Sequence, residues 1–273
     1  MARRRPAGAS EPGPRVKRST RRRLIQLTCY ALFLGGVVGL FARGLLGLEY
    51  TWEWGRFFRE WSPLLLEGLL LTLKVASVSL VLALPLGVLV GLGRVARDPM
   101  ARLIAFLYVE IVRGTPLLVQ VFLWYFVLGP MFELRSFGAS VGALSCFTAS
   151  YIAEIVRAGI QGIDRGQMEA ARSLGLTHVQ AMRLVILPQA LRRVLPPLAS
   201  EFVALVKDSS LASVAALNEL TKKTQEVQAS SYLTFEPWIA TACLYLAVCV
   251  VLSLGVRLLE RWLGVGHREE VIR

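Results

Sequence analysis

Apolar blocks of similar length alternate with polar segments along the chain. Five blocks contain no charged residue: Leu24–Ala42, Val75–Gly93, Gly114–Phe132, Ser136–Ala153 and Pro237–Val256. Each is 18 to 20 residues long, which at about 1.5 Å per residue matches the roughly 30 Å hydrocarbon core of a bilayer. A sixth stretch, Val194–Ala216, is interrupted by Glu201, Lys207 and Asp208. The pattern predicts an all-α, polytopic transmembrane helical bundle with about six spans.

Composition and charge support a membrane protein with a defined orientation. Of the 273 residues, 55% are hydrophobic and 18% are charged, and the mean hydropathy is +0.54; about a quarter of the residues of an ordinary soluble domain are charged. Nine basic residues precede residue 24, and further basic residues follow the blocks that end at Gly93, Ala153 and Val256. Because positively charged loops stay in the cytoplasm, we expect both termini inside the cell.

The same pattern predicts the division of the chain. We expect a disordered basic cytoplasmic tail at 1–23, an additional span and outer loop at 24–60, a transmembrane domain at 61–263 and a second cytoplasmic tail at 264–273. A cleaved signal peptide is the alternative for the first span. Its apolar stretch is longer than a usual signal sequence and no convincing small-residue cleavage site follows, so we expect an uncleaved anchor.

Glycine and proline predict local features within the spans. Gly87 and Gly91 form a GxxxG motif, which allows a neighbouring helix to approach closely. Thr115 with Pro116 should bend or restart a helix, because proline disfavours the helical conformation in the residue before it and lacks a backbone N–H.

A polar insert, Glu154–Pro188, separates the fourth predicted span from the fifth. Strong helix formers run from Gln167 to Leu174, and Gly175 can adopt the left-handed conformation that ends a helix. Thr177 can then cap a second helix that runs to the end of the insert. We therefore expect two short helices at about 164–188.

The middle of the insert is a candidate contact surface. Glu169 stands near the first turn of its helix, and Ala170 and Ala171 should leave a bare surface on which another protein could seat. A well-capped linker between spans is an alternative of equal weight. A helix-turn-helix reader of DNA is a weaker one, because that unit needs a third helix and a soluble core.

Ionisable residues within or at the end of spans are candidates for contact with a polar solute, because a charge in the bilayer is costly. Three pairs qualify: Glu110 with Arg113, Glu154 with Arg157, and Lys207 with Asp208. The first two pairs are spaced i, i+3, so their members can neutralise each other on a helix. Pairing of Asp208 with Lys207 or with a neighbouring helix is the alternative to a role in a solute path.

The sequence offers no constellation for catalysis. It contains no P-loop, no GxGxxG opening a strand, no HExxH and no nucleophile elbow. Its two histidines, His178 and His267, have no partners at metal-ligand spacing. We expect no metal, no cofactor and no enzymatic activity, so that a conduit of this kind must take its energy from elsewhere.

The insert resembles the EAA signature of the membrane subunits of ABC importers. The matching residues are Glu169, Ala170, Ala171, Gly175, Leu187 and Pro188, and Val185 stands where that pattern usually has Ile. The segments VEIVRGTPLLVQ, YIAEIVRAGIQGIDRGQMEAARSLG, LPQALRRVLPPL and LVKDSSLAS resemble the polar amino-acid uptake branch, the permeases for histidine, glutamine, arginine and similar solutes. The resemblance covers roughly Leu64–Trp262.

The resemblance implies a subunit of a larger machine in the bacterial cytoplasmic membrane. The insert would be a coupling helix, with Glu169, Ala170, Ala171 and Gly175 docking on a pair of ABC ATPase subunits. A second permease subunit, identical or similar, and an extracytoplasmic solute-binding protein that delivers the amino-acid substrate would complete it. Nucleic acid would have no part. The rival function is an ATP-independent secondary transporter or channel, although no internal repeat of the kind common in such transporters is found.

Overall fold

The computed structural model describes most of the chain after its N-terminal region. The described residues are 28–33, 35–36, 38–40, 43–44, 47 and 50–263. The chain divides into two units, Met1–Trp52 and Glu53–Arg273. The predicted tails at 1–23 and 264–273 lie outside the described residues, and the predicted first span is described only in part, as helical residues within Thr28–Leu40.

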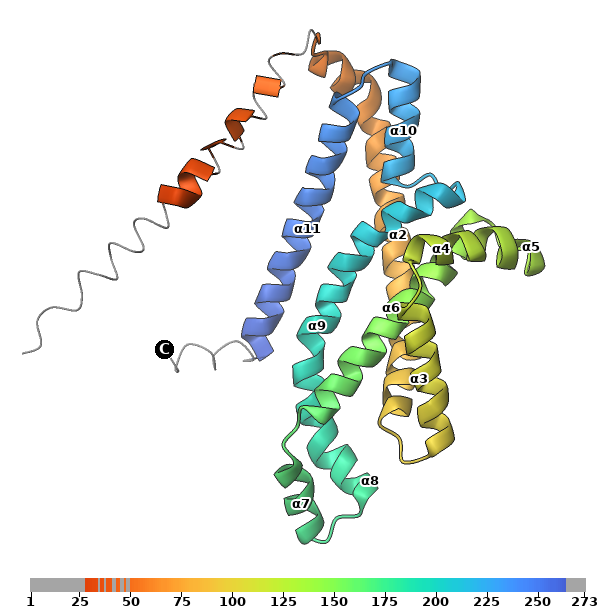
Figure 1. Ribbon diagram of the computed structural model, residues 1–273, viewed down its shortest axis with the longest axis vertical. Helices are drawn as coiled ribbons and strands as arrows, with labels where there is room; N and C mark the ends of the chain where they lie inside the picture. Colours follow the sequence, from red (N-terminus) through yellow and green to blue (C-terminus); the bar gives the residue numbers. More distant parts are fainter. Residues whose placement is uncertain are drawn as a thin grey trace, which may run out of the picture. The chain divides into compact units, whose positions relative to one another are not determined.

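The regular structure described in the second unit is entirely helical (Figure 1). The α-helices are α2 (Trp54–Arg94), α3 (Pro99–Arg113), α4 (Leu117–Phe122), α5 (Gly129–Met131), α6 (Ser136–Gln161), α7 (Arg165–Ser173), α8 (His178–Ala181), α9 (Leu187–Asp208), α10 (Leu220–Ser231) and α11 (Glu236–Leu263). Two π-helical segments, η1 (Leu123–Leu128) and η2 (Met182–Ile186), and one 3₁₀ segment, η3 (Ser209–Ala215), connect them. The predicted all-α class is confirmed.

Three described helices, α2, α6 and α11, are long and apolar enough to cross a membrane. A fourth span results if α3 and Leu117–Met131, which are bent by 100° relative to each other, are counted together. Helix α9, which carries Glu201, Lys207 and Asp208, is not among them. The total of six spans stays a prediction.

Glycines bring α2 and α6 into the most extensive helix contact of the second unit. A Cβ atom added at Gly87 would lie 2.6 Å from Cβ of Ile152, and one at Gly91 would lie 2.7 Å from Cβ of Val156. Both distances are shorter than carbon atoms tolerate, so the backbone of α2 can approach α6 only because these positions lack a side chain. The close approach predicted from the GxxxG motif is therefore confirmed.

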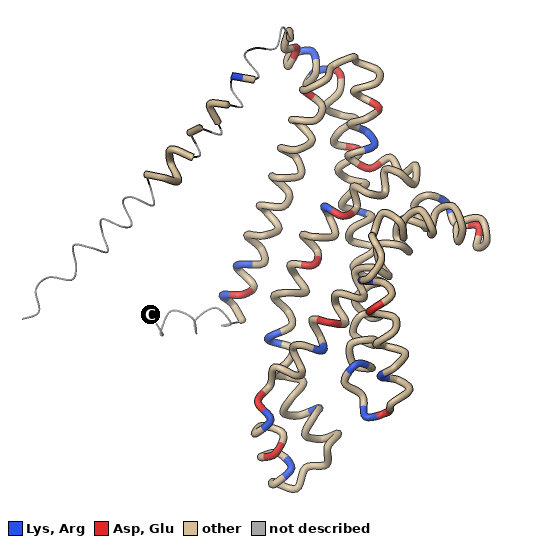
Figure 2. Tube along the Cα trace, viewed as in Figure 1, with Lys and Arg blue, Asp and Glu red and all other residues tan. Residues whose placement is uncertain are grey.

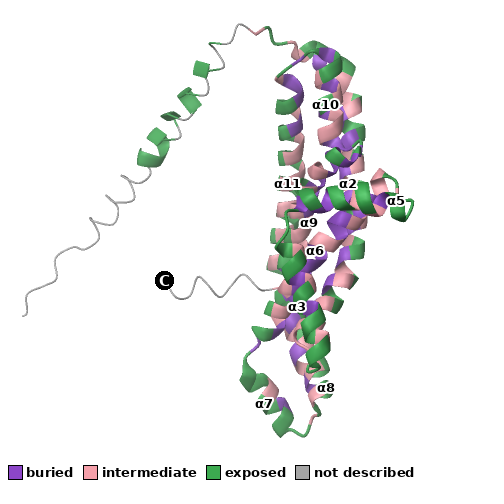
Figure 3. Ribbon diagram, turned by 45° about the vertical axis from the view of Figure 1, so that its right-hand side comes forward, coloured by how far each residue is buried: buried purple, intermediate pink, exposed green. Residues whose placement is uncertain are grey.

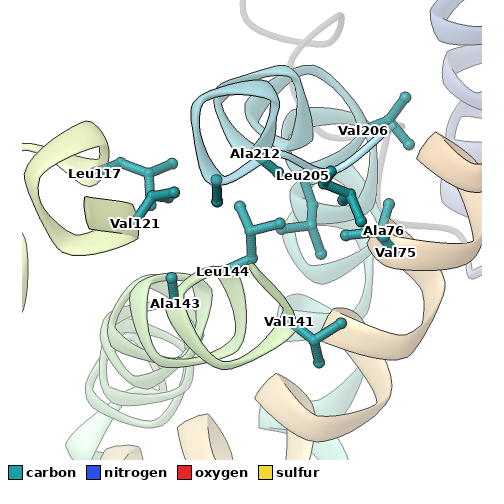
Figure 4. Packing of buried hydrophobic residues seen from close by; sticks show 12 residues of the cluster. Val75, Ala76, Leu117, Val121, Val141, Ala143, Leu144, Leu205, Val206 and Ala212 are labelled. Atoms are coloured by element: carbon teal, nitrogen blue, oxygen red, sulfur yellow. The ribbon is translucent and has the colours of Figure 1, made fainter. Parts of the chain in front are cut away.

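A buried cluster joins α2 and α6 to the second half of the unit (Figure 4). Leu144 of α6 and Leu205 of α9 lie at its centre, and Val75 of α2 completes one side. Leu117 and Val121 of α4 reach the same cluster from the other side, beside η3. The cluster thus ties four helical segments that are far apart in the sequence.

The chain turns sharply between α3 and α4, where the sequence predicted a bend. Helix α3 ends at Arg113, and α4 begins after Pro116, whose backbone is extended. The side-chain amide nitrogen of Gln120, Nε2, donates to the carbonyl oxygen of Val112 at 2.7 Å and to the hydroxyl oxygen of Thr115 at 2.8 Å. A side chain thereby satisfies a carbonyl that the interrupted helix leaves without a backbone partner.

The second helix of the insert does not end at Pro188, contrary to expectation. Helix α8 runs into η2, and η2 runs directly into α9, which has Pro188 in its first turn. A proline in a first turn needs no N–H donor, and a π-helical turn shifts the hydrogen-bond pattern just before it. The insert is therefore joined to α9 without a loop.

Helix α10 is fastened by a buried carboxylate. Glu219 is fully buried and accepts hydrogen bonds from the backbone N–H groups of Thr221 at 2.9 Å and Lys222 at 2.8 Å. The hydroxyl of Tyr245 on α11 donates to it at 3.0 Å, and Thr72 of α2 lies beside it. Burial raises the pKa of the Glu219 carboxyl above its usual value, although the backbone donors oppose this shift.

We predict that Gly87→Ala destabilises the protein by about 1–3 kcal/mol, because the new methyl group overpacks the contact with Ile152. The matched control is Gly255→Ala on α11, where an added Cβ would meet no atom within 4 Å. Thermal unfolding of both variants in the same detergent measures the effect. Equal stability of the two variants would contradict the role given to the α2–α6 contact.

Candidate functional site

The insert folds as a helix, a tight turn and a second helix, as its residues predicted. Asp164 caps α7 by accepting from the backbone N–H of Gly166 at 2.7 Å. Gly175 follows the end of α7 with a φ angle of +85°, the left-handed conformation that glycine adopts without strain. Thr177 then caps α8 in a reciprocal capping box with Gln180. The predicted helix end at Gly175 and the predicted cap at Thr177 are confirmed.

The exposed surface of α7 differs in part from the predicted one. Glu169 and Ala170 are exposed, but Ala171 is only 4% exposed. The expectation of a bare surface is therefore wrong for Ala171. A nine-residue helix is unstable alone, so one of its faces must pack, and α7 packs on α8 and η2.

Two exposed apolar residues on the insert were not singled out from the sequence. Leu174 is 84% exposed and Val179 is 73% exposed. They flank the turn at Gly175, at the far end of the second unit from α10 (Figures 1 and 3). The sequence could have indicated them, because an apolar residue stands on either side of the predicted helix end at Gly175.

The insert is fixed to the ends of α6 and α9. Ile163, just before α7, and Ile186, at the end of η2, belong to one buried cluster with Val156 of α6 and Val194 of α9. The guanidinium of Arg193 on α9 donates to the carbonyl oxygen of Gly162, which follows α6. A displacement of α7 and α8 would therefore reach both long helices through packed atoms rather than through a loose linker.

The predicted pair Glu154–Arg157 forms on α6, because the first residues of the predicted insert, up to Gln161, continue that helix. Nε of Arg157 donates to Oε1 of Glu154 at 2.9 Å, and Nη1 of Arg157 donates to Gln161. Nη2 of Arg94 on α2 lies 3.6 Å from Oε2 of Glu154. One carboxylate thus stands between two arginines from different helices.

The predicted pair Glu110–Arg113 does not form among the ion pairs of the described residues, so that expectation is wrong. The guanidinium of Arg113 instead lies over the ring of Tyr151 on α6, 4.9 Å from its centroid. A cation is attracted to the face of an aromatic ring, and this contact draws Arg113 away from its own helix.

Lys207 and Asp208 face different surroundings. Lys207 is exposed and lines a groove of about 380 Å³ with Ser200 and with Arg257 and Glu260 of α11. Asp208 is half-buried and shares a helix face with Glu201, seven residues earlier. No ion pair within 4.0 Å joins Lys207 to Asp208 among the described residues, so the pairing alternative receives no support for this couple.

Glu201 is a candidate that the sequence reasoning treated only as an interruption of a span. The negative charge of Asp208 and the positive charge of Arg113 both act on its carboxyl group. Arg113 acts on Glu154 as well. Charges of α3, α6 and α9 thus act on one another. The heptad spacing between Glu201 and Asp208 was the signal that could have revealed this.

Known transport proteins resemble this chain over most of its length. The family model described as "Binding-protein-dependent transport system inner membrane component" matches residues 83–265. The glutamine transport system permease protein GlnP of Escherichia coli (strain K12) is 41% identical over 202 residues, which cover 73% of this chain and 92% of that protein. The arginine transport system permease protein ArtQ of Bacillus subtilis (strain 168) is 36% identical over 201 residues, with coverage of 73% and 92%.

Solved structures agree with the relatives. A crystal structure of an amino acid ABC transporter with histidines superposes with a TM-score of 0.73 at 38% identity, over 78% of this chain and 99% of that chain. The inward-facing MetNI methionine ABC transporter shares the fold, with a TM-score of 0.66 at 20% identity. The chain therefore belongs to the family of binding-protein-dependent transport system inner membrane components, as its resemblance to ABC importer permeases predicted.

Proposed function

We propose that the chain is the permease subunit of an ATP-driven importer that moves a polar or charged amino acid across the bacterial cytoplasmic membrane. The observation that carries the proposal is the exposed insert, in which Glu169, Ala170 and Gly175 stand on a helix pair packed onto α6 and α9. Relatives named as glutamine and arginine transport permeases support an amino acid as the solute.

The proposed assembly contains several further subunits. A pair of ABC ATPase subunits would bind the insert, and a second permease subunit, identical or similar, would complete the membrane part. An extracytoplasmic solute-binding protein would deliver the amino acid, in keeping with the description of the family. Basic residues on alternate loops support a multi-pass arrangement with both termini in the cytoplasm.

The proposed coupling acts through the exposed face of α7 and the turn after it. Glu169, Ala170 and Gly175 would contact the ATPase, and the exposed side chain of Leu174 would add apolar surface to that contact. Ala171 would act from inside, by holding α7 on the rest of the insert. Movement of the ATPase pair would then shift α6 and α9 together.

The proposed solute path follows the charges between α3, α6 and α9. A guanidinium such as that of Arg113 suits the carboxylate of an amino acid, and the carboxylates of Glu201 and Asp208 suit its ammonium group. Four further ionisable residues belong to the proposed path: Glu110, Glu154, Arg157 and Lys207. The first of these is exposed on α3, and the Glu154–Arg157 pair stands near the insert.

The coupling proposal predicts that Glu169→Lys and Leu174→Asp each reduce uptake by about tenfold, as expected when a central interface residue worth ~1.4 kcal/mol is lost. Uptake of radiolabelled glutamine, arginine and histidine is measured in cells that carry the whole transport system. Glu226→Lys, which makes the same charge change on α10, away from the insert and from the proposed path, is the control. Normal uptake by both insert variants at normal membrane abundance would refute the coupling role.

The path proposal predicts that Asp208→Asn and Glu201→Gln raise the KM for uptake of the same labelled solutes by about fivefold, because each removes one favourable charge worth ~1 kcal/mol. Glu226→Gln, at a surface ion pair of α10, is the matched control. Unchanged uptake kinetics in both path variants would leave Asp208 and Glu201 with a structural role only.

The energy source separates the proposed importer from a secondary transporter or channel. In membrane vesicles that carry the whole system, we expect uptake to stop when ATP is depleted and to continue when the ion gradient is collapsed. The opposite pattern, in which uptake survives without ATP and stops without the gradient, would favour the secondary transporter.

A further inference from the structure

A basic groove lies between the end of α2, the start of α3 and the end of α6, outside the charges assigned to the solute path on α9. Its volume is about 500 Å³. Its lining combines arginines with apolar residues: Arg94, Arg102, Arg157, Leu103 and Phe106, together with Pro99 and Gln161. Figure 2 shows the basic residues gathered at the loop between α2 and α3.

The groove carries an excess of positive charge. Three guanidinium groups line it, and among the described residues one carboxylate forms ion pairs with them: that of Glu154, which is bonded to Arg157 and lies 3.6 Å from Arg94. The carboxylate of Asp98, in the adjoining loop, caps α3 by accepting from Ala101 at 2.7 Å. The charge of the groove lining therefore favours an anion.

The arginines are held in place with donors to spare. Arg94 lies over the ring of Phe106, 5.0 Å from its centroid, which holds its guanidinium at the groove. Nε and Nη2 of Arg102 donate to the carbonyl oxygen of Ala96 at 3.2 and 2.7 Å, which leaves Nη1 for another acceptor. Guanidinium groups fixed in this way match the oxygens of a phosphate.

An apolar strip on α3 leads away from these arginines. Leu103, Phe106 and Leu107 are all exposed and follow one another at helical spacing, and Ile104 lies beside them. A free phosphate ion would contact only the arginines. A molecule with both a phosphate and hydrocarbon chains would use the arginines and the strip together.

We propose that this groove binds the headgroup of an anionic phospholipid such as phosphatidylglycerol. Its phosphate would lie between Arg94 and Arg102, and its acyl chains would follow Leu103 and Phe106 along α3. A basic pocket between helices at the cytoplasmic surface of a bilayer is a recognised kind of site for such headgroups. The site does not depend on which solute the protein transports.

The test counts phosphatidylglycerol molecules bound to the purified full-length chain by native mass spectrometry in a mild detergent. Arg102→Gln and Arg94→Gln should each weaken the first binding event by about fivefold, the contribution expected of one basic residue near a membrane. Arg97→Gln, which removes a charge from the same loop outside the groove, should leave it within about twofold. Equal losses in all three variants would overturn the proposal, because they would indicate binding to surface charge in general.

Two further measurements distinguish the lipid from a free phosphate. Leu103→Gln should weaken phosphatidylglycerol binding, since it makes the apolar strip polar without changing a charge, and inorganic phosphate should not displace the lipid. Unchanged lipid binding in Leu103→Gln, or displacement by inorganic phosphate alone, would overturn the lipid assignment. Arg102 and Leu103 are both exposed, so the melting temperatures of these variants should match that of the parent chain.

Discussion

The close contact between α2 and α6 depends on Gly87 and Gly91, because a side chain at either position would collide with α6. The positions of several other groups in the second unit depend on this contact. Gly87 packs against Ile152 and Gly91 packs against Val156. In this register Arg94, which follows Gly91 by about one turn of α2, places its guanidinium beside Glu154 of α6. That register forms the basic groove at the end of the two helices. The same approach lets Leu144 of α6 reach the core that holds α9.

Non-α turns stand where helices must change course. The π-helical η2 leads from the insert into α9, and the 3₁₀ segment η3 begins directly after Asp208. Such turns often mark functional or strained positions, because they redirect the chain while its backbone remains hydrogen-bonded. Here they adjoin the proposed coupling insert and the proposed solute path, the two places where a transporter has to transmit movement.

Most ion pairs of the described residues lie along one helix, but a few charged side chains of the second unit make contacts between helices. Arg113 turns to Tyr151 rather than to Glu110, and Glu154 attracts Arg94 as well as its own neighbour Arg157. Contacts of this kind link the helices that would move against one another in transport. Arg102 keeps a free donor, so the proposed solute path and the proposed lipid site can lie on the same bundle without sharing all their residues.

The sequence by itself determined what depends on neighbouring residues: the helical class, the chain break at Thr115–Pro116, the helix end at Gly175 and the cap at Thr177. Backbone preference and hydrogen bonds within a few residues fix these features, so they can be predicted without a tertiary structure. Only the tertiary structure decided that Ala171 is buried, that Glu201 is grouped with Arg113, and that Lys207 and Asp208 face apart. Burial and charge pairing depend on which helices meet and in what register, and this is set by long-range packing such as that of Gly87 on Ile152.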